Sequence, residues 1–157
     1  MTLHQNAFGV DLSYDWLDVQ SRRRNTYRRI PNTPEAIAAF VTELLAEPIT
    51  PFVVFEATSG CDHELRQQLN AAGILFHRIN PRQAREFARG TGKYAKTDKV
   101  DARVLAEIAY RLDLAPTVEP SQVRKDLSEL VTRRDQLVEE IVREKTPRLA
   151  APPVANG

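Results

Sequence analysis

The sequence predicts an α/β fold in which helices flank a mixed five-stranded sheet, and three observations support this prediction. Three short strand-like segments stand close together near the N-terminus, at 7–12, 16–20 and 26–30. Two further apolar segments, 52–55 and 74–79, come later and are separated by helix-like sequence. Strands joined by short turns pair antiparallel, whereas strands joined through a helix run parallel, so the sheet should be mixed.

The segments around the later strands carry helix signals. Thr33 is a suitable N-cap, and Pro34 stands at the first helical position, where its missing N–H is tolerated. Gly73 ends a second helix, and Asn80 caps a third. The expected helical spans are 34–47, 62–72, 81–88 and 98–112.

A long helix is expected from Ser121 to about Lys145, where apolar residues follow a heptad pattern interrupted by Arg134. The apolar heptad positions are Leu127, Leu130, Leu137 and Ile141. This pattern predicts a coiled-coil-like helix that seeks a partner. We therefore divide the chain into an α/β domain at 1–115, a coiled-coil helix at 121–146 and a disordered, proline-rich tail at 147–157.

The order of elements matches one known fold. A three-stranded meander followed by helix, strand, helix, strand and further helices is the order of the RNase H-like fold, whose sheet order is 3-2-1-4-5. In that order the first and fourth strands are central neighbours. Aromatic residues in the first turn, Tyr14 and Trp16, are expected to be turn and core residues rather than stacking platforms. Asp15 and Asp18 are expected to be solvated.

Composition narrows the functional class. The 157 residues include one cysteine, so the chain cannot form an internal disulfide or a cysteine-based zinc site. The polar N-terminus does not resemble a signal peptide, and no apolar run is long enough to span a membrane. We therefore expect a soluble, cytoplasmic protein with no membrane partner.

The placement of charge suggests a nucleic-acid partner although the net charge is only +1. Arginine accounts for most of the 22 basic residues, and its planar fork suits phosphate. Between Arg78 and Arg103 basic residues outnumber acidic ones, which predicts a polyanion-binding face, with a solvated helix face as the alternative. The candidate nucleic-acid-binding residues are Arg82, Arg85, Arg89, Lys93, Tyr94, Lys96, Lys99 and Arg103.

Four acidic residues are the candidate catalytic and metal-binding groups. Asp11 lies inside the first strand, and Glu56 ends the fourth strand, its expected neighbour. Asp98 and Asp101 stand three residues apart at the start of a helix and so share a helix face. Four close carboxylates need a compensating cation, and oxygen ligands suit Mg²⁺ or Mn²⁺. Taken singly, each acid could instead accept backbone hydrogen bonds, cap a helix or pair with an arginine.

Three motifs resemble the DEDD transposases of bacterial insertion sequences, also described as bridge-RNA-guided recombinases and related to the Piv DNA invertases. The motifs begin at Phe8 (Phe-Gly-Val-Asp-Leu-Ser), at Phe55 (Phe-Glu-Ala-Thr-Ser-Gly) and at Lys96 (Lys-Thr-Asp-Lys-Val-Asp-Ala-Arg). The third is the most specific, and the resemblance covers residues 7 to 146 in the same motif order.

The resemblance implies more than the residues do. It implies a RuvC-like N-terminal domain that uses Mg²⁺ or Mn²⁺ at Asp11, Glu56, Asp98 and Asp101 to cleave and transfer DNA strands. It also implies a coiled coil, dimers or tetramers on DNA, a structured guide RNA in some members, and a second domain that carries a nucleophilic serine. This sequence ends at Gly157 without such a domain, so complete recombination is expected to require it.

Two other functions compete with DNA cleavage. A non-catalytic module could bind nucleic acid through 78–103 and dimerise through the last helix without cutting. An actin-like kinase or ATPase would share the sheet topology, but such enzymes have a glycine-rich phosphate turn after the first strand. The turn here, Ser13-Tyr14-Asp15-Trp16, has no glycine, and the chain is short for that two-domain fold.

Overall fold

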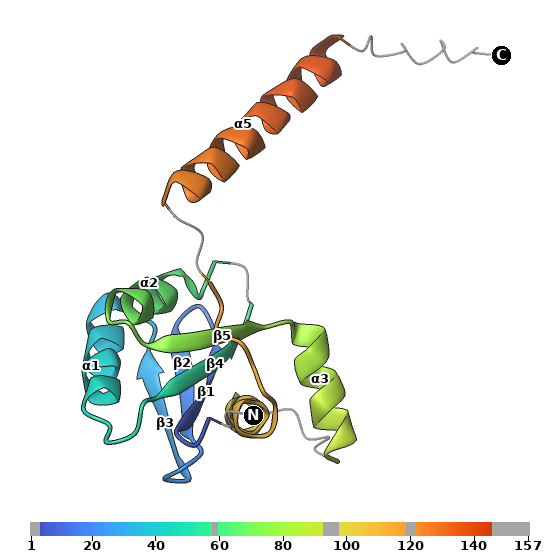
Figure 1. Ribbon diagram of the computed structural model, residues 1–157. Coiled ribbons are helices and arrows are strands. Elements are labelled where there is room, and N and C mark those ends of the chain that lie inside the picture. Colours follow the sequence, from blue (N-terminus) through green and yellow to red (C-terminus); the bar gives the residue numbers. More distant parts are fainter. Residues whose placement is uncertain (1–3, 58–59, 93–97, 119–121, 146–157) are drawn as a thin grey trace, which may run out of the picture. The chain divides into compact units, whose positions relative to one another are not determined.

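The computed structural model describes residues 4–57, 60–92, 98–118 and 122–145, and the chain divides into two compact units after Thr117. The first unit contains a five-stranded sheet with the order β3-β2-β1-β4-β5 (Figure 1). Its strands are β1 (Ala7–Leu12), β2 (Trp16–Ser21), β3 (Thr26–Pro31), β4 (Phe52–Glu56) and β5 (Leu75–Ile79). The predicted mixed sheet and its RNase H-like strand order are confirmed.

The register of the sheet places β1 at its centre. β1 pairs antiparallel with β2, where Asp11 stands opposite Asp18. On its other side β1 pairs parallel with β4, and Val10 stands opposite Phe55. The helix between β3 and β4 is what allows this parallel pairing, because a tight turn could only produce an antiparallel pair.

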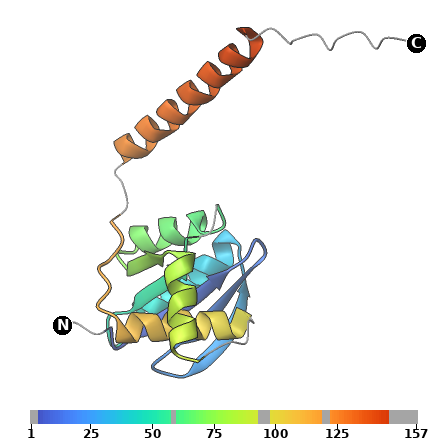
Figure 2. The same cartoon turned by 90° about the vertical axis from the view of Figure 1, so that its right-hand side faces the viewer.

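Helices cover both faces of the sheet. Figure 1 shows α1 (Pro34–Leu45) and α2 (His63–Ala71) on one face, and α3 (Pro81–Gly90) on the other. α4 (Asp98–Arg111) crosses this second face next to α3, as the turned view in Figure 2 shows. Each predicted helix is present, with ends shifted by one or two residues. The caps agree as well, because the Thr33 and Asn80 side chains accept hydrogen bonds from the backbone amides of Ala36 and Arg82.

Two apolar cores follow from the alternation of side chains along the strands. Phe8, Val10 and Phe55 point into the core beneath α1 and α2. Ala7 and Val54 point to the opposite face, where they pack with the apolar side of α4. The two central strands are apolar on both faces because helices cover both.

The second unit contains α5 (Gln122–Lys145), which agrees with the long helix expected from the heptad pattern. The heptad residues Leu127, Leu130, Leu137 and Ile141 are all exposed on it. Pairing of this helix into a coiled coil stays a prediction, and the tail predicted to be disordered, 147–157, lies outside the described residues. Among the helices of the described part of the chain, none is long and apolar enough to cross a membrane.

Candidate active site

Asp11 and Glu56 occupy neighbouring strands at the carboxyl edge of the sheet. Val10 and Phe55 are paired in the parallel β1–β4 ladder, and the two acids are the next residue on each strand. Both are half-buried. Because side chains alternate, the two acids share the face of Ala7 and Val54, which is the face covered by α4. The sequence-based placement of these two acids as neighbours is therefore met by the strand pairing.

Asp101 comes to the same face on α4. The neighbouring residue of α4, Ala102, lies against Gly9, and a Cβ built on Gly9 would be 2.0 Å from the Ala102 carbonyl oxygen. The direction of α4 is given by its C-terminal half, where Glu107 forms an ion pair with Arg22 at 3.2 Å. The Arg22 amide donates to the carbonyl of Ala7, at the start of β1. The N-terminal half of α4, with Asp101, therefore lies toward the Asp11 end of β1.

Asp98 is the first residue of α4, but its side chain lies outside the described ones. Among the side chains that the structure does describe, no group of three or more histidine, cysteine, aspartate or glutamate residues is arranged to hold a metal ion. Asp11, Glu56 and Asp101 are thus gathered on one face and at one edge. The described side chains of these three acids do not surround a single metal position.

Asp18 is buried, contrary to the expectation that it would be solvated. It stands opposite Asp11 across the β1–β2 ladder and is only 2% exposed. Its carboxylate accepts two hydrogen bonds from Arg29, from Nε at 3.0 Å and Nη2 at 2.9 Å, and one from the Tyr27 hydroxyl. The burial of Asp18 could not be predicted from the strand pattern, because a charged residue on a strand is more often exposed. Arg29 compensates Asp18, the acid opposite Asp11 on β2, so Asp11 does not face an unpaired negative neighbour on that strand.

Asn32 joins the loops that follow the two acid-bearing strands. Its side-chain amide donates to the Ser13 carbonyl at 2.8 Å and to the Cys61 carbonyl at 3.2 Å. Ser13 follows β1, and Cys61 precedes α2 in the connection that leaves β4. The Asn32 backbone amide also donates to the carbonyl of Asp15 at 2.8 Å. Asn32, a single residue in the segment that precedes α1, therefore holds together the loops that follow Asp11 and Glu56.

A buried ion pair secures the second of these loops. Asp62 is 1% exposed, and its Oδ2 atom lies 2.7 Å from Nε of Arg78 on β5 and 3.4 Å from Nε of Arg66 on α2. Arg78 had been counted in the basic segment, but its side chain belongs to this internal pair. Sequence reasoning missed Asp62, whose only signal was its position before the α2 helix.

The predicted nucleic-acid-binding residues fall into two groups. Arg82, Arg85 and Arg89 are exposed on α3, where their spacing places them along one side of the helix, and Arg103 is exposed on α4. Arg82 also forms a surface ion pair with Glu86 at 3.2 Å. Lys93, Tyr94 and Lys96 lie outside the described residues, and so does the side chain of Lys99.

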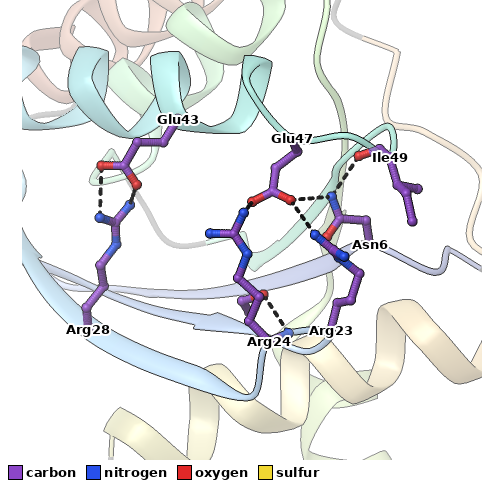
Figure 3. Close-up of polar contacts among 8 residues, drawn as sticks. Asn6, Arg23, Arg24, Arg28, Glu43, Glu47 and Ile49 are labelled. Carbon is purple, nitrogen blue, oxygen red and sulfur yellow. Dashed lines mark hydrogen bonds and ion pairs between the residues drawn. The ribbon is translucent and has the colours of Figure 1, made fainter.

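A second arginine cluster lies on the β2–β3 hairpin and is neutralised by acids of the domain. Figure 3 shows Glu47, after α1, between Arg23 and Arg24, with N–O distances of 3.1 and 2.5 Å. The Glu47 side chain is only 4% exposed and also accepts from Asn6. Arg28 forms an ion pair with Glu43 on α1 at 2.6 Å. These arginines hold the hairpin to α1 rather than forming an unpaired basic surface.

The sheet order, the helices on both faces and the acids at the carboxyl edge define an RNase H-like α/β domain. The sequence profile of an IS110-type DEDD transposase family, described as transposase, matches residues 12–150. Since the match spans most of the chain, the chain belongs to this transposase family, which the three motifs had predicted. Comparison with curated protein sequences gives no match.

Solved structures support the fold. The RuvC structure from Thermus thermophilus is 13% identical, with a TM-score of 0.52, over 71% of this chain and 99% of that one. RuvC from the same organism in complex with a Holliday junction substrate is 14% identical, with a TM-score of 0.43, over 64% and 88% of the two chains. The catalytic core domain of BIV integrase is 12% identical, with a TM-score of 0.34, over 83% and 99%. The first of these structures, with a TM-score of 0.52, shows that the fold of this chain is RuvC-like.

Proposed function

We propose that this chain is the catalytic domain of a DNA transposase, which cleaves and transfers DNA strands at Asp11, Glu56, Asp98 and Asp101. The observation that carries the proposal is the placement of Asp11 and Glu56 side by side at the carboxyl edge of β1 and β4. α4 brings Asp101 to the same face through its contact with Gly9. Membership of a transposase family supports DNA as the partner.

The donor set fits a divalent metal ion of the hard class. Asp11, Glu56 and Asp101 offer carboxylate oxygens, which Mg²⁺ and Mn²⁺ prefer. The acid of β2, Asp18, is bound to Arg29, so it is not counted among the proposed ligands. When bound, such an ion supplies Lewis acidity for phosphodiester chemistry. The half-burial of Asp11 and Glu56 limits their contact with water and so favours binding of a cation between them.

The exposed arginines on α3 and α4 would hold the DNA backbone. Arg82, Arg85 and Arg89 form a row on α3, and α3 packs beside α4, the helix that carries Asp101. Guanidinium groups in such a row neutralise successive phosphates. Within the same proposal, residues 1–115 form the catalytic domain, and the helix at 121–146 pairs with a second copy. A serine-bearing domain and a structured guide RNA complete the recombinase.

A non-catalytic binding module is the second candidate. One observation favours it: within the described side chains, no three acids are arranged around one metal position. In that case the arginines of α3 would bind DNA, and the acids would play no chemical part. The two candidates differ in one measurable property, which is metal-dependent strand cleavage.

The test compares the wild-type chain with Asp11→Asn and with the control Asp113→Asn, which removes an exposed acid from the segment after α4. Cleavage of branched and duplex DNA is measured in Mg²⁺, in Mn²⁺ and in chelator, and DNA binding is measured alongside. The proposal expects metal-dependent cleavage that Asp11→Asn abolishes and Asp113→Asn retains, with binding intact in all three. Binding without cleavage by any of them would support the binding module.

A further inference from the structure

Exposed aromatic side chains are concentrated at the turn between β1 and β2. Tyr14 is 85% exposed and Trp16 is 44% exposed. The expectation that Trp16 is a core residue is therefore wrong. The other described aromatic residues, Phe8, Tyr27, Phe40, Phe52, Phe55, Phe76, Phe87 and Tyr110, are buried or half-buried. Exposure of two large rings within three residues is unusual and marks a candidate binding surface.

The backbone of this turn is held firmly although its aromatic rings are exposed. The Ser13 amide and hydroxyl both donate to the Trp16 carbonyl, at 2.9 and 3.0 Å, and the Trp16 amide donates to the Ser13 hydroxyl at 3.1 Å. Asn32 adds its two bonds to the carbonyls of Ser13 and Asp15. A rigid support of this kind lowers the entropy lost when an exposed ring binds a ligand.

Tyr14 lines a hollow of about 600 Å³. The turn after β1, the start of α1 and the start of α2 form its walls. Its lining includes Tyr14, Asp15, Asn32, Thr33, His63 and Glu64. None of the described residues that line it is an arginine or lysine, so these residues do not suit a phosphate. Carboxylate and amide groups beside an aromatic ring instead suit a flat ring with amino groups on its edge.

We propose that Tyr14 and this hollow form a stacking site for an unpaired nucleobase. The Tyr14 ring stacks on the face of the base, and Asp15 and Glu64 accept hydrogen bonds from its amino edge. The location supports this use, because the turn begins directly after β1, which carries Asp11, and the opposite wall lies in the connection that follows Glu56. A base held there belongs to a nucleotide close to the carboxylate edge. The ligand class follows from the proposed function, in which the partner is nucleic acid.

Photocrosslinking in chelator tests the site without any cleavage. The probe is a branched DNA that carries one unpaired 5-iodocytosine, a base with an exocyclic amino group, at the branch point, and a fully paired duplex carries the same label as its control. Wild type should crosslink to the unpaired label through the peptide that contains Tyr14. Tyr14→Ala should lose this crosslink and bind the branched probe about 5- to 150-fold more weakly, because stacking contributes about 1–3 kcal/mol per base. Tyr14→Phe keeps the aromatic ring and should retain both the crosslink and the affinity for the branched probe.

The matched control is Leu75→Ala, which removes a 47% exposed apolar side chain at the opposite, amino end of the parallel strands. It should bind and crosslink as wild type does. Equal crosslinking of Tyr14→Ala and wild type, or a crosslink that maps elsewhere, would overturn the proposal. The same probes made of RNA show whether the base comes from DNA or from RNA, since a stronger RNA crosslink at Tyr14 assigns the site to an RNA base. Because no cleavage is measured, an inactive acidic site would leave this result unaffected.

Discussion

Gly9 of β1 lies against the backbone of Ala102 in α4, with no room between them for a side chain. A Cβ atom on Gly9 would stand 2.0 Å from the Ala102 carbonyl oxygen and 2.4 Å from the Ala106 amide nitrogen. This contact fixes how closely α4 approaches the sheet. It therefore also fixes the distance of Asp101, the residue before Ala102, from the strand that carries Asp11.

Gly9→Ala should destabilise the domain, because a backbone carbonyl cannot yield as a flexible side chain would. Overpacking of this kind costs about 1–3 kcal/mol or more, which lowers the melting temperature by about 5 °C or more in a domain of this size. Thermal unfolding followed by circular dichroism measures the change. The control is Gly90→Ala at the end of α3, where an added Cβ meets nothing within 4 Å. Equal melting temperatures for the two variants would contradict the close approach of α4.

Mg²⁺ or Mn²⁺ should raise the melting temperature of the wild-type chain in a concentration-dependent manner. An ion that binds only the folded protein stabilises it by RT ln(1 + [L]/Kd), about 2.7 kcal/mol at a hundredfold excess over Kd. Asp11→Asn removes one proposed ligand and should lose this shift, whereas Asp113→Asn should keep it. The measurement is a metal titration by differential scanning fluorimetry. An identical shift in all three proteins would place the ion elsewhere.

Asn32→Asp should loosen the edge of the sheet that carries the acids. The new carboxylate cannot donate to the Ser13 and Cys61 carbonyls, and it places a negative charge beside them. Leaving such groups unsatisfied costs about 1–3 kcal/mol. Chemical denaturation compares this variant with Asn70→Asp, which adds the same charge at an exposed position of α2. We expect a clear loss for Asn32→Asp only, and equal losses would show that the added charge, not the lost bonds, is responsible.

Glu47→Ala should destabilise the β2–β3 hairpin more than Glu43→Ala does. Glu47 is 4% exposed and binds both Arg23 and Arg24, so its loss leaves two guanidinium groups without their acceptor. We expect a loss of about 1.5–3 kcal/mol from these charged hydrogen bonds. Glu43 is 58% exposed and, within the described part of the chain, pairs with the one arginine Arg28, so its removal should cost at most about 1 kcal/mol. Urea denaturation of both variants measures the difference, and a larger effect at Glu43 would refute this ranking.

Much of the fold was predictable because its signals are local. Thr33 and Asn80 cap their helices as the sequence indicates, and the apolar stretch at 52–55 lies in the buried strand β4 that its composition predicts. The neighbourhood of Asp11 and Glu56 was also predictable, since it follows once the strand order is known. The burial of Asp18 and the exposure of Trp16 were not predictable, because each depends on what packs against its strand. Single-sequence periodicity does not contain that information.

The sequence by itself determined the order of strands and helices, the family motifs and the positions of the four acids along the chain. Those features depend on residue type and spacing, which are properties of the chain alone. Only the tertiary structure decided that Arg78 pairs with Asp62, that Arg29 binds Asp18, and that Asn32 joins the loops after Asp11 and Glu56. Such contacts join residues far apart in sequence. They form only when packing of the helices on the sheet brings their atoms within hydrogen-bonding distance.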